Sequence, residues 1–146
     1  MSVRENIASN LLSVISAISS PITIKKATRQ PLDLDEISAK QYPAVIEQTS
    51  EETSDDEELG SGAKTRLATI DFVVSGFVKG AESNIDTKRN ELITAIETAI
   101  ESDITRNSNA LDTMVVACET DEGTLFPIGG IRMTIRCVYT YQSGTP

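Results

Sequence analysis

The sequence predicts an α+β fold, in which a mostly antiparallel sheet of about four to five strands carries two helices on one face. Two stretches have the apolar spacing of amphipathic helices, and several others alternate apolar with polar residues as half-buried strands do. The expected order of elements is α-β-β-β-α-β-β, which is typical of a layered α+β domain. A length of 146 residues predicts one domain over residues 1–146.

The first helix is expected from Val3 to a point near Pro21. Ser2 and Glu5 fit a capping box, in which each side chain satisfies the other residue's backbone amide. Proline ends the helix because it disfavours helical geometry in the residue before it. The apolar stripe of this helix comprises Val3, Ile7, Leu11, Val14 and Ile18.

Three strands are expected next. Ile22–Ile24 is a short candidate, followed by the basic residues Lys25, Lys26 and Arg29. The segment Ala44–Ile46 is typical of a second, buried strand that runs into Glu47. The third strand is the longest, and period-two alternation places its apolar side chains on one face. These side chains are Ala68, Ile70, Phe72, Val74 and Val78.

An acidic run separates the second and third strands. Residues Glu51–Glu58 contain six acids in eight positions, and glycines follow at Gly60 and Gly62. Because like charges repel and glycine adds backbone freedom, we expect a mobile, solvated loop over residues 50–62. A Ca²⁺ or Mg²⁺ site is the alternative, since hard cations prefer carboxylate oxygens, but the run lacks the spaced pattern of a calcium loop.

The second helix is expected to begin near Asp86, a good N-cap residue, and to end before a polar turn over Asp103–Asn109. Its apolar stripe comprises Leu92, Ile93, Ile96 and Ile100. The segment Met114–Glu119 is apolar on both faces, which favours a central strand. A long hairpin loop, Thr120–Gly130, then leads to the last strand. The inward residues of that strand are Ile131, Met133, Ile135, Cys137, Tyr139 and Tyr141.

The composition excludes several classes of active site. The chain has no histidine, which excludes catalytic triads with histidine, Cys-His pairs and His-ligated zinc. A net charge of −9 argues against broad binding to a nucleic-acid backbone. No apolar run approaches the length that spans a bilayer, and the protein is expected to be cytoplasmic when made. We therefore expect no catalytic residue, no cofactor and no resident metal.

Two further groups leave alternatives open. Cys118 and Cys137 fall in two predicted strands, where a bridge is geometrically allowed, although free, buried thiols are favoured. Asp33, Asp35 and Glu36 place three carboxylates in four residues, which suits either acid–base or metal chemistry or a polar connecting segment.

Charged residues also give a candidate protein interface. Arg132 and Arg136 project from one face of the last strand, either as an exposed polar face or as a subunit contact, where arginine is favoured. The full candidate set is Glu51, Glu52, Asp55, Asp56, Glu57, Glu58, Arg132 and Arg136.

Seven short segments, taken in their order along the chain, resemble the tail terminator (tail completion) proteins of tailed bacteriophages, including the minor tail protein U group. The resemblance covers nearly the whole chain and rests on general features in order rather than on one specific motif. These are Arg4–Ile7, Tyr42–Ile46 before the acidic run, Phe72–Val78, the helix with Leu92, Ile96 and Ile100, Asp121–Gly123, Pro127–Gly129 and Val138–Tyr141.

The resemblance implies a hexameric ring that caps the last ring of tail-tube subunits, stops elongation and presents a surface to the neck or head connector. Its partners would be further copies, the tube protein, the connector and, in a contractile tail, a sheath protein. DNA would pass through without specific binding, no membrane would be involved, and the location would be the virion tail or neck, assembled in the host cytoplasm.

Three alternatives remain for the function. One is another head–tail joining subunit (neck or head-completion) or a baseplate adaptor. The second is a small metal-dependent enzyme that uses Asp33, Asp35 and Glu36. The third is a generic oligomeric domain unrelated to phage. If the protein is a structural phage protein, residues 51–62 and 120–130 are the segments that we expect to become ordered on contact with a partner.

Overall fold

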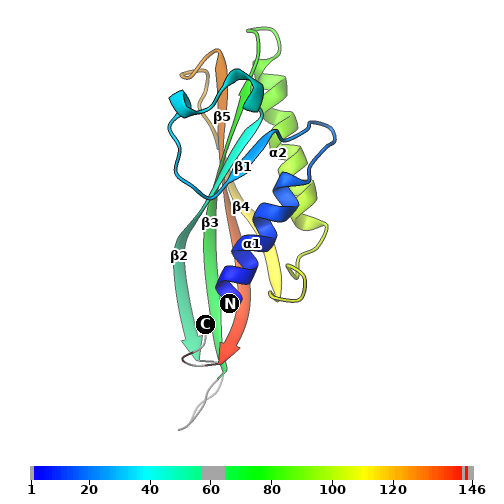
Figure 1. The fold of residues 1–146 in the computed structure, drawn as a ribbon. Helices are drawn as coiled ribbons and strands as arrows, with labels where there is room; N and C mark the ends of the chain where they lie inside the picture. Colours follow the sequence, from blue (N-terminus) through cyan, green and yellow to red (C-terminus); the bar gives the residue numbers. More distant parts are fainter. Residues whose placement is uncertain (1, 57–64, 143, 145–146) are drawn as a thin grey trace.

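The computed structural model describes residues 2–56, 65–142 and 144. It confirms the predicted fold class: a five-stranded, mostly antiparallel sheet with two helices packed against it (Figure 1). The elements are α1 (Val3–Ser16), β1 (Lys26–Thr28), two short 3-10 turns (Leu34–Glu36 and Ala39–Gln41), β2 (Ala44–Asp56), β3 (Thr65–Lys79), α2 (Ile85–Glu101), β4 (Asp112–Thr120) and β5 (Ile128–Gln142).

The strands lie in the order β1-β2-β3-β5-β4. β1 runs parallel to β2, and every other neighbouring pair is antiparallel. The central ladder joins β3 to β5 without interruption, from the Thr65–Gln142 pair to the Lys79–Ile128 pair. The predicted alternation of β5 is confirmed, but β3 is not the single longest strand, because β3 and β5 each contain 15 residues.

The core lies between the helices and one face of the sheet, which we call the inner face. α1 packs over β1 and β2, and α2 packs over β3, β5 and β4. Every second residue of β3 and β5 is buried there, as the alternation predicts. The buried helix residues include Ile7, Leu11 and Ile15 from α1 and Leu92, Ile96 and Ile100 from α2.

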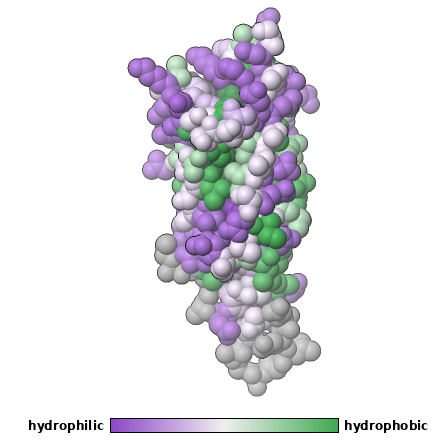
Figure 2. Space-filling view, turned by 90° about the vertical axis from the view of Figure 1, so that its right-hand side faces the viewer, coloured by the Kyte–Doolittle hydropathy of each residue, from purple (hydrophilic) through white to green (hydrophobic). Residues whose placement is uncertain are grey.

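Figure 2 shows the molecule from the side that lies on the right in Figure 1. Hydrophilic side chains dominate the upper end of this view, and hydrophobic side chains gather in its middle part. Some hydrophobic side chains are therefore exposed on this side of the molecule, which is ordinary for a soluble protein.

The first helix begins as predicted and ends earlier. The Ser2 hydroxyl accepts a hydrogen bond from the Glu5 amide at 3.2 Å, which is half of a capping box. The Glu5 carboxylate binds the Arg29 guanidinium, a stronger partner than a backbone amide. The helix stops at Ser16, although Ile18 remains buried in the chain that follows.

The predicted strand at Ile22–Ile24 is wrong. The strand is β1, two residues further on, because the amides of Lys25 and Lys26 bond the Pro43 carbonyl and bring β1 into register with Ala44–Ile46. Ile24 is buried in the core without belonging to a strand. Its apolar side chain therefore indicated burial correctly, but it did not indicate strand geometry.

The predicted acidic loop over residues 50–62 is wrong in its first part. Residues 50–56 belong to β2, which pairs with β3 as far as Asp56 opposite Arg66. Cross-strand pairing outweighs the charge repulsion because neighbouring acids point to opposite faces of the sheet. A register shift between Thr49 and Glu52 interrupts the ladder. Residues 57–62 lie outside the described residues.

The predicted central position of Met114–Glu119 is also wrong. These residues form most of β4, which is the edge of the sheet beyond β5. Met114 and Val116 remain 39% and 40% exposed. Apolar residues on both faces are typical of a strand covered on both sides, and the described part of the chain does not cover this one.

The second helix begins one residue before the predicted cap. Asn84 precedes it and accepts a hydrogen bond from the Ala81 amide at 2.9 Å. Asp86 lies inside the first turn and binds Arg89 instead of capping the helix. None of the helices formed by the described residues is long and apolar enough to cross a membrane.

Candidate protein interface

The face of the sheet opposite the helices, which we call the outer face, carries most of the candidate residues. Alternation along β3 sends its second set of side chains to this face, where no described helix lies over them. These side chains remain half-buried between neighbouring strands. They are Leu67, Thr69, Asp71, Val73, Ser75 and Phe77.

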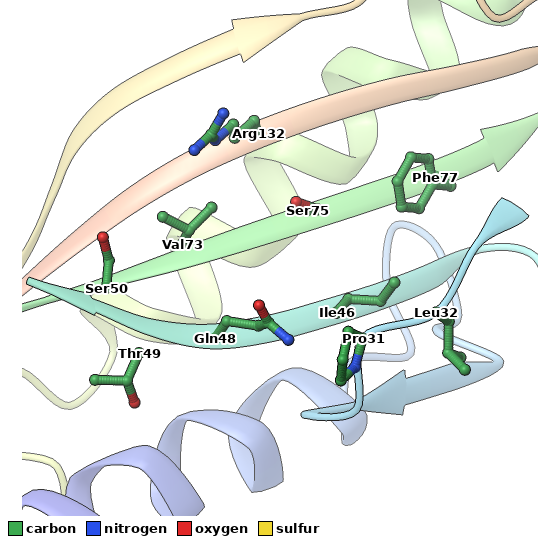
Figure 3. Close-up of a pocket in the computed structure, with 10 residues that line it drawn as sticks. All are labelled: Pro31, Leu32, Ile46, Gln48, Thr49, Ser50, Val73, Ser75, Phe77 and Arg132. Atoms are coloured by element: carbon green, nitrogen blue, oxygen red, sulfur yellow. The ribbon is translucent and has the colours of Figure 1, made fainter.

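A hollow of about 440 Å³ lies on the outer face. Three strands and the segment after β1 contribute to it, as Figure 3 shows, with β3 between β2 and β5. Its lining residues are Pro31, Leu32, Ile46, Gln48, Thr49, Ser50, Val73, Ser75, Phe77 and Arg132. The mixture of aliphatic, aromatic and uncharged polar groups is typical of a surface that contacts another protein.

Arg132 lies at the boundary of two hollows. It lines the hollow of about 440 Å³ and also a neighbouring one of about 210 Å³, together with Ser75 and Phe77. Its side chain is exposed and forms no ion pair with any residue that the structure describes, although Glu119 is its cross-strand neighbour on β4. The guanidinium is therefore available to an external carboxylate.

Arg136 differs from Arg132 because it already has a partner. Its Nε and Nη2 atoms donate to the two Asp71 carboxylate oxygens at 2.9 Å and 3.1 Å. This hydrogen-bonded ion pair raises the pKa of the Arg136 guanidinium. The two residues line a third hollow on the outer face with Glu51, Thr53 and Thr69.

The acidic candidates divide between the two faces of β2. Glu51 lies beside the Asp71–Arg136 pair, and Asp55 is exposed opposite Leu67. Glu52 lies on the inner face, where its carboxylate accepts hydrogen bonds from Arg4 and from the Tyr139 hydroxyl. Glu52 therefore joins α1 to the sheet. Asp56 ends β2, and Glu57 and Glu58 lie outside the described residues.

A second charged cluster on the inner face was not predicted. Glu47 is fully buried, and neither carboxylate oxygen has a hydrogen-bond partner among the described residues. The Arg29 Nε atom lies 3.8 Å from Glu47 Oε2, while the same guanidinium binds Glu5. Burial raises the pKa of Glu47 to about 8, in spite of the opposing effect of Arg29. Nothing in the sequence pattern marks this carboxylate as buried.

The carboxylates Asp33, Asp35 and Glu36 lie in and beside the first 3-10 turn, and all three are exposed. Glu36 Oε1 accepts a hydrogen bond from the Asp33 amide at 3.2 Å, so this carboxylate caps the turn. No group of three or more acidic or cysteine side chains suited to a metal ion occurs within residues 2–56 and 65–142.

Both cysteines are free. Cys137 is buried and lies 3.6 Å from the Thr113 hydroxyl, its cross-strand neighbour. Cys118 is exposed on β4 and lies opposite Met133. The expectation of buried thiols is confirmed for Cys137 and wrong for Cys118, because β4 is an edge strand.

The hairpin between β4 and β5 is held by a buried ion pair. Arg89 Nη1 on α2 donates to Asp121 Oδ1 at 2.6 Å, and the amides of Gly123 and Leu125 also donate to this carboxylate. These hydrogen bonds hold the hairpin against α2.

Exposed large apolar side chains are concentrated on β4 and on the turns at its two ends. Among the described residues, all of them fall between positions 104 and 126. They are Ile104, Leu111, Met114, Val116, Leu125 and Phe126. A concentration of this kind is typical of a contact surface rather than of scattered surface hydrophobics.

No known protein family matches the chain, and no curated protein matches it. Among solved structures, the chain is similar to one described as "Virion of native gene transfer agent (GTA) particle". The similarity covers 96% of this chain and 92% of that chain, with 10% sequence identity and a TM-score of 0.40. A likeness at this level carries no argument about the function of this chain.

Proposed function

We propose that the protein is a structural component of a phage-like virion, in which copies form a ring, expected to be hexameric, on the end of the tail tube. The ring stops tube elongation and joins the tail to the neck or head connector. It acts through surface complementarity, without a chemical step. The proposal rests on the sequence resemblance to tail terminator proteins and on the contact surfaces of the fold.

The observation that carries the proposal is the outer face of the sheet. It combines hollows lined by Val73 and Phe77 with Arg132, an exposed guanidinium that has no ion pair within the described chain. Arginine and aromatic side chains are enriched in protein interfaces. A partner that presents a carboxylate beside an apolar group would satisfy both features.

A ring suits the task because a head-to-tail contact that closes on itself matches the rotational symmetry of a tube. An acidic chain also suits a ring around passing DNA, since it does not retain the phosphates. The tube protein, the connector and, in a contractile tail, the sheath protein are the proposed partners.

The direct test is tail length after deletion of the gene from the source particle, measured by negative-stain electron microscopy. We expect overlong tubes without heads, and tubes of normal length when the wild-type protein is supplied. Tails of normal length on complete particles would exclude termination. Tails of normal length that stay detached from filled heads would favour the alternative, a neck or head-completion subunit.

A variant experiment tests the outer face itself. Arg132→Glu is expected to fold as the wild type does and to fail in restoring tail length, because it reverses the charge that Arg132 offers to the partner. Lys40→Glu makes the same change of charge at an exposed position in the second 3-10 turn and should restore tail length. Full complementation by Arg132→Glu would remove the outer face from the proposed contact.

A further inference from the structure

The two edges of the sheet carry opposite charges. At one edge, Lys25 and Lys26 lie immediately before and within β1. At the other edge, Glu119 lies in β4, and Glu97 on α2 is close enough to Cys118 to raise the pKa of that thiol, after the larger effect of burial. None of these four charged side chains forms an ion pair with another residue in the described ranges.

The opposite charges lie close to the same level of the sheet, because Lys26 is two residues before Thr28, which shares a row with Glu119. One row of cross-strand partners runs from Thr28 through Ile46, Ser75 and Arg132 to Glu119. Paired residues in a sheet project from the same face, so Glu119 shares the outer face with Arg132. Lys26 pairs with Ala44, which pairs with Phe77, so it also projects to the outer face.

The β4 edge is open to a further strand. Its nine residues include no lysine, arginine or proline, the residues with which proteins usually protect an edge. The exposed Met114 and Val116 add apolar area next to the free backbone groups. The β1 edge is short and half-buried, and it offers two ammonium groups beside small side chains.

We propose that successive copies of this chain join edge to edge, with β1 of one copy against the Glu119 end of β4 of the next copy. Lys26 then faces Glu119, and Lys25 lies close to Glu97. The inference rests on the proposed ring and deepens it, because it names the contact between neighbouring subunits.

Charge selects this contact over the other ways of joining two edges. Two β1 edges would oppose lysine to lysine, and two β4 edges would bring only carboxylates together, since no cation lies on β4. Like charges placed opposite each other across a sheet are destabilising. The β1–β4 contact uses two different surfaces and is therefore heterologous, which is the kind of contact that closes into a ring.

Cysteine cross-linking of the purified protein tests the contact. Lys25→Cys adds a thiol at the β1 edge, while the exposed Cys118 supplies the other at the β4 edge. Under mild oxidation we expect a ladder of dimers, trimers and higher species on a non-reducing gel. Lys25→Cys combined with Cys118→Ala can give only dimers, and Lys40→Cys with native Cys118 controls for random collision.

A charge-exchange experiment tests the same contact without a covalent bond. Lys26→Glu and Glu119→Lys are each expected to weaken self-association about tenfold in sedimentation velocity at low salt. An equimolar mixture of the two variants should regain it, because each altered edge then meets an opposite charge on its neighbour.

Each outcome has a defined meaning. In the cross-linking experiment, the proposal is overturned if Lys25→Cys gives dimers only, or gives no larger species than Lys40→Cys does. In the charge-exchange experiment, it is overturned if Lys26→Glu and Glu119→Lys each associate as strongly as the wild type. A ladder together with normal tail length in the gene-deletion experiment would leave the subunit contact standing and reject the capping role. Overlong tails after gene deletion, together with the absence of a cross-linked ladder, would support the capping role and reject the proposed subunit contact.

Discussion

Arg89 on α2 and Asp121 in the β4–β5 hairpin form a buried ion pair that holds the hairpin against the helix. The two side chains are joined at 2.6 Å, and each is 8% exposed. Burial alone would raise the pKa of Asp121, but hydrogen bonds from the amides of Leu125 and Gly123 and from Arg89 outweigh it and lower the pKa. The pair therefore positions the loop beside Glu119, at the edge that we propose as a subunit contact.

Removal of the cation should be costly. Arg89→Leu leaves a buried carboxylate without its countercharge, and we expect a loss of about 3 kcal/mol in the free energy of unfolding at pH 7. Urea denaturation followed by circular dichroism measures it. The control is Asp86→Asn, which removes only the partner of Arg89 that is 75% exposed, and should cost less than about 0.5 kcal/mol. Equal losses in the two variants would contradict the importance of the buried pair.

The same pair predicts a response to acid. Because the pKa of Asp121 is lowered in the folded state, its contribution is present at neutral pH and is lost as the pH falls through that lowered value. The stability of Arg89→Leu should therefore fall less between pH 5 and pH 3 than that of the wild type, as measured by denaturation at each pH.

Glu47 predicts the opposite dependence on pH. Its pKa rises from 4.5 to about 8 on folding, chiefly because it is buried, so between these values the folded state holds a proton that the unfolded state has released. Stability should then fall as the pH rises from 4.5 to 8. Glu47→Gln imitates the protonated form, and we expect it to equal the wild type near pH 4.5 and to be more stable at pH 8, by on the order of 4 kcal/mol.

Denaturation curves of Glu47→Gln at the two pH values check this prediction. Glu51→Gln, which removes the same charge at an exposed position on the same strand, is the matched control. A Gln variant that is less stable than the wild type at both pH values would mean that charged Glu47 stabilises the fold through Arg29.

At Gly76, β3 lies close beneath Leu92 of α2. A Cβ atom there would lie 2.7 Å from Leu92 Cδ2 and 3.0 Å from Ile131 Cγ1. We expect Gly76→Ala to cost about 2 kcal/mol because a fully buried leucine must move. Ser75→Ala, on the outer face of the same strand, should change the free energy of unfolding by less than about 0.5 kcal/mol. Combination with Leu92→Ala should cost less than the sum of the single changes, measured as a double-mutant cycle.

Arg106 closes the C-terminal end of α2 from the turn that follows. Its guanidinium is fully buried and donates to the carbonyls of Ile100 and Asp103. Carbonyls in the last turn of a helix have no partner within the helix, so Arg106→Met should cost about 2 kcal/mol. Hydrogen exchange should show the loss of protection at the end of α2. Asn107→Gly, at a neighbouring position with φ 57°, is the control and should stay within about 1 kcal/mol.

The sequence was sufficient for the elements whose pattern reflects a single buried face. β3, β5 and the two helices alternate or repeat as one-sided burial requires, so their type and most of their extent followed from periodicity. β2 was underestimated because its acidic half pairs with β3 in spite of its charge. In that case cross-strand partners decided the backbone, and these are invisible in a local window.

β4 shows why the candidate interface could be predicted only in part. Its apolar residues predicted burial, but Met114 and Val116 are exposed in the structure. The sequence does not say whether a further strand of the same sheet or another molecule covers them. Arg132 was identified from its place on a polar face. Glu47, Arg89 and Arg106 were missed because a buried charge has no periodic signal and depends on which distant residues meet it.

The place of β5 in the sheet has a consequence for how the chain reaches its fold. β5 comes last of the five strands in the sequence, yet it lies between β3 and β4 and holds them together. Its pairs with β3 join residues as distant in sequence as Thr65 and Gln142. The entropy cost of closing this long stretch of chain must therefore be met before the hydrogen bonds between β3 and β5 can form. We expect slow, all-or-none folding on a timescale of about milliseconds to seconds. During synthesis on the ribosome, β3 could therefore complete its pairing with β5 only after residue 142 had left the ribosome.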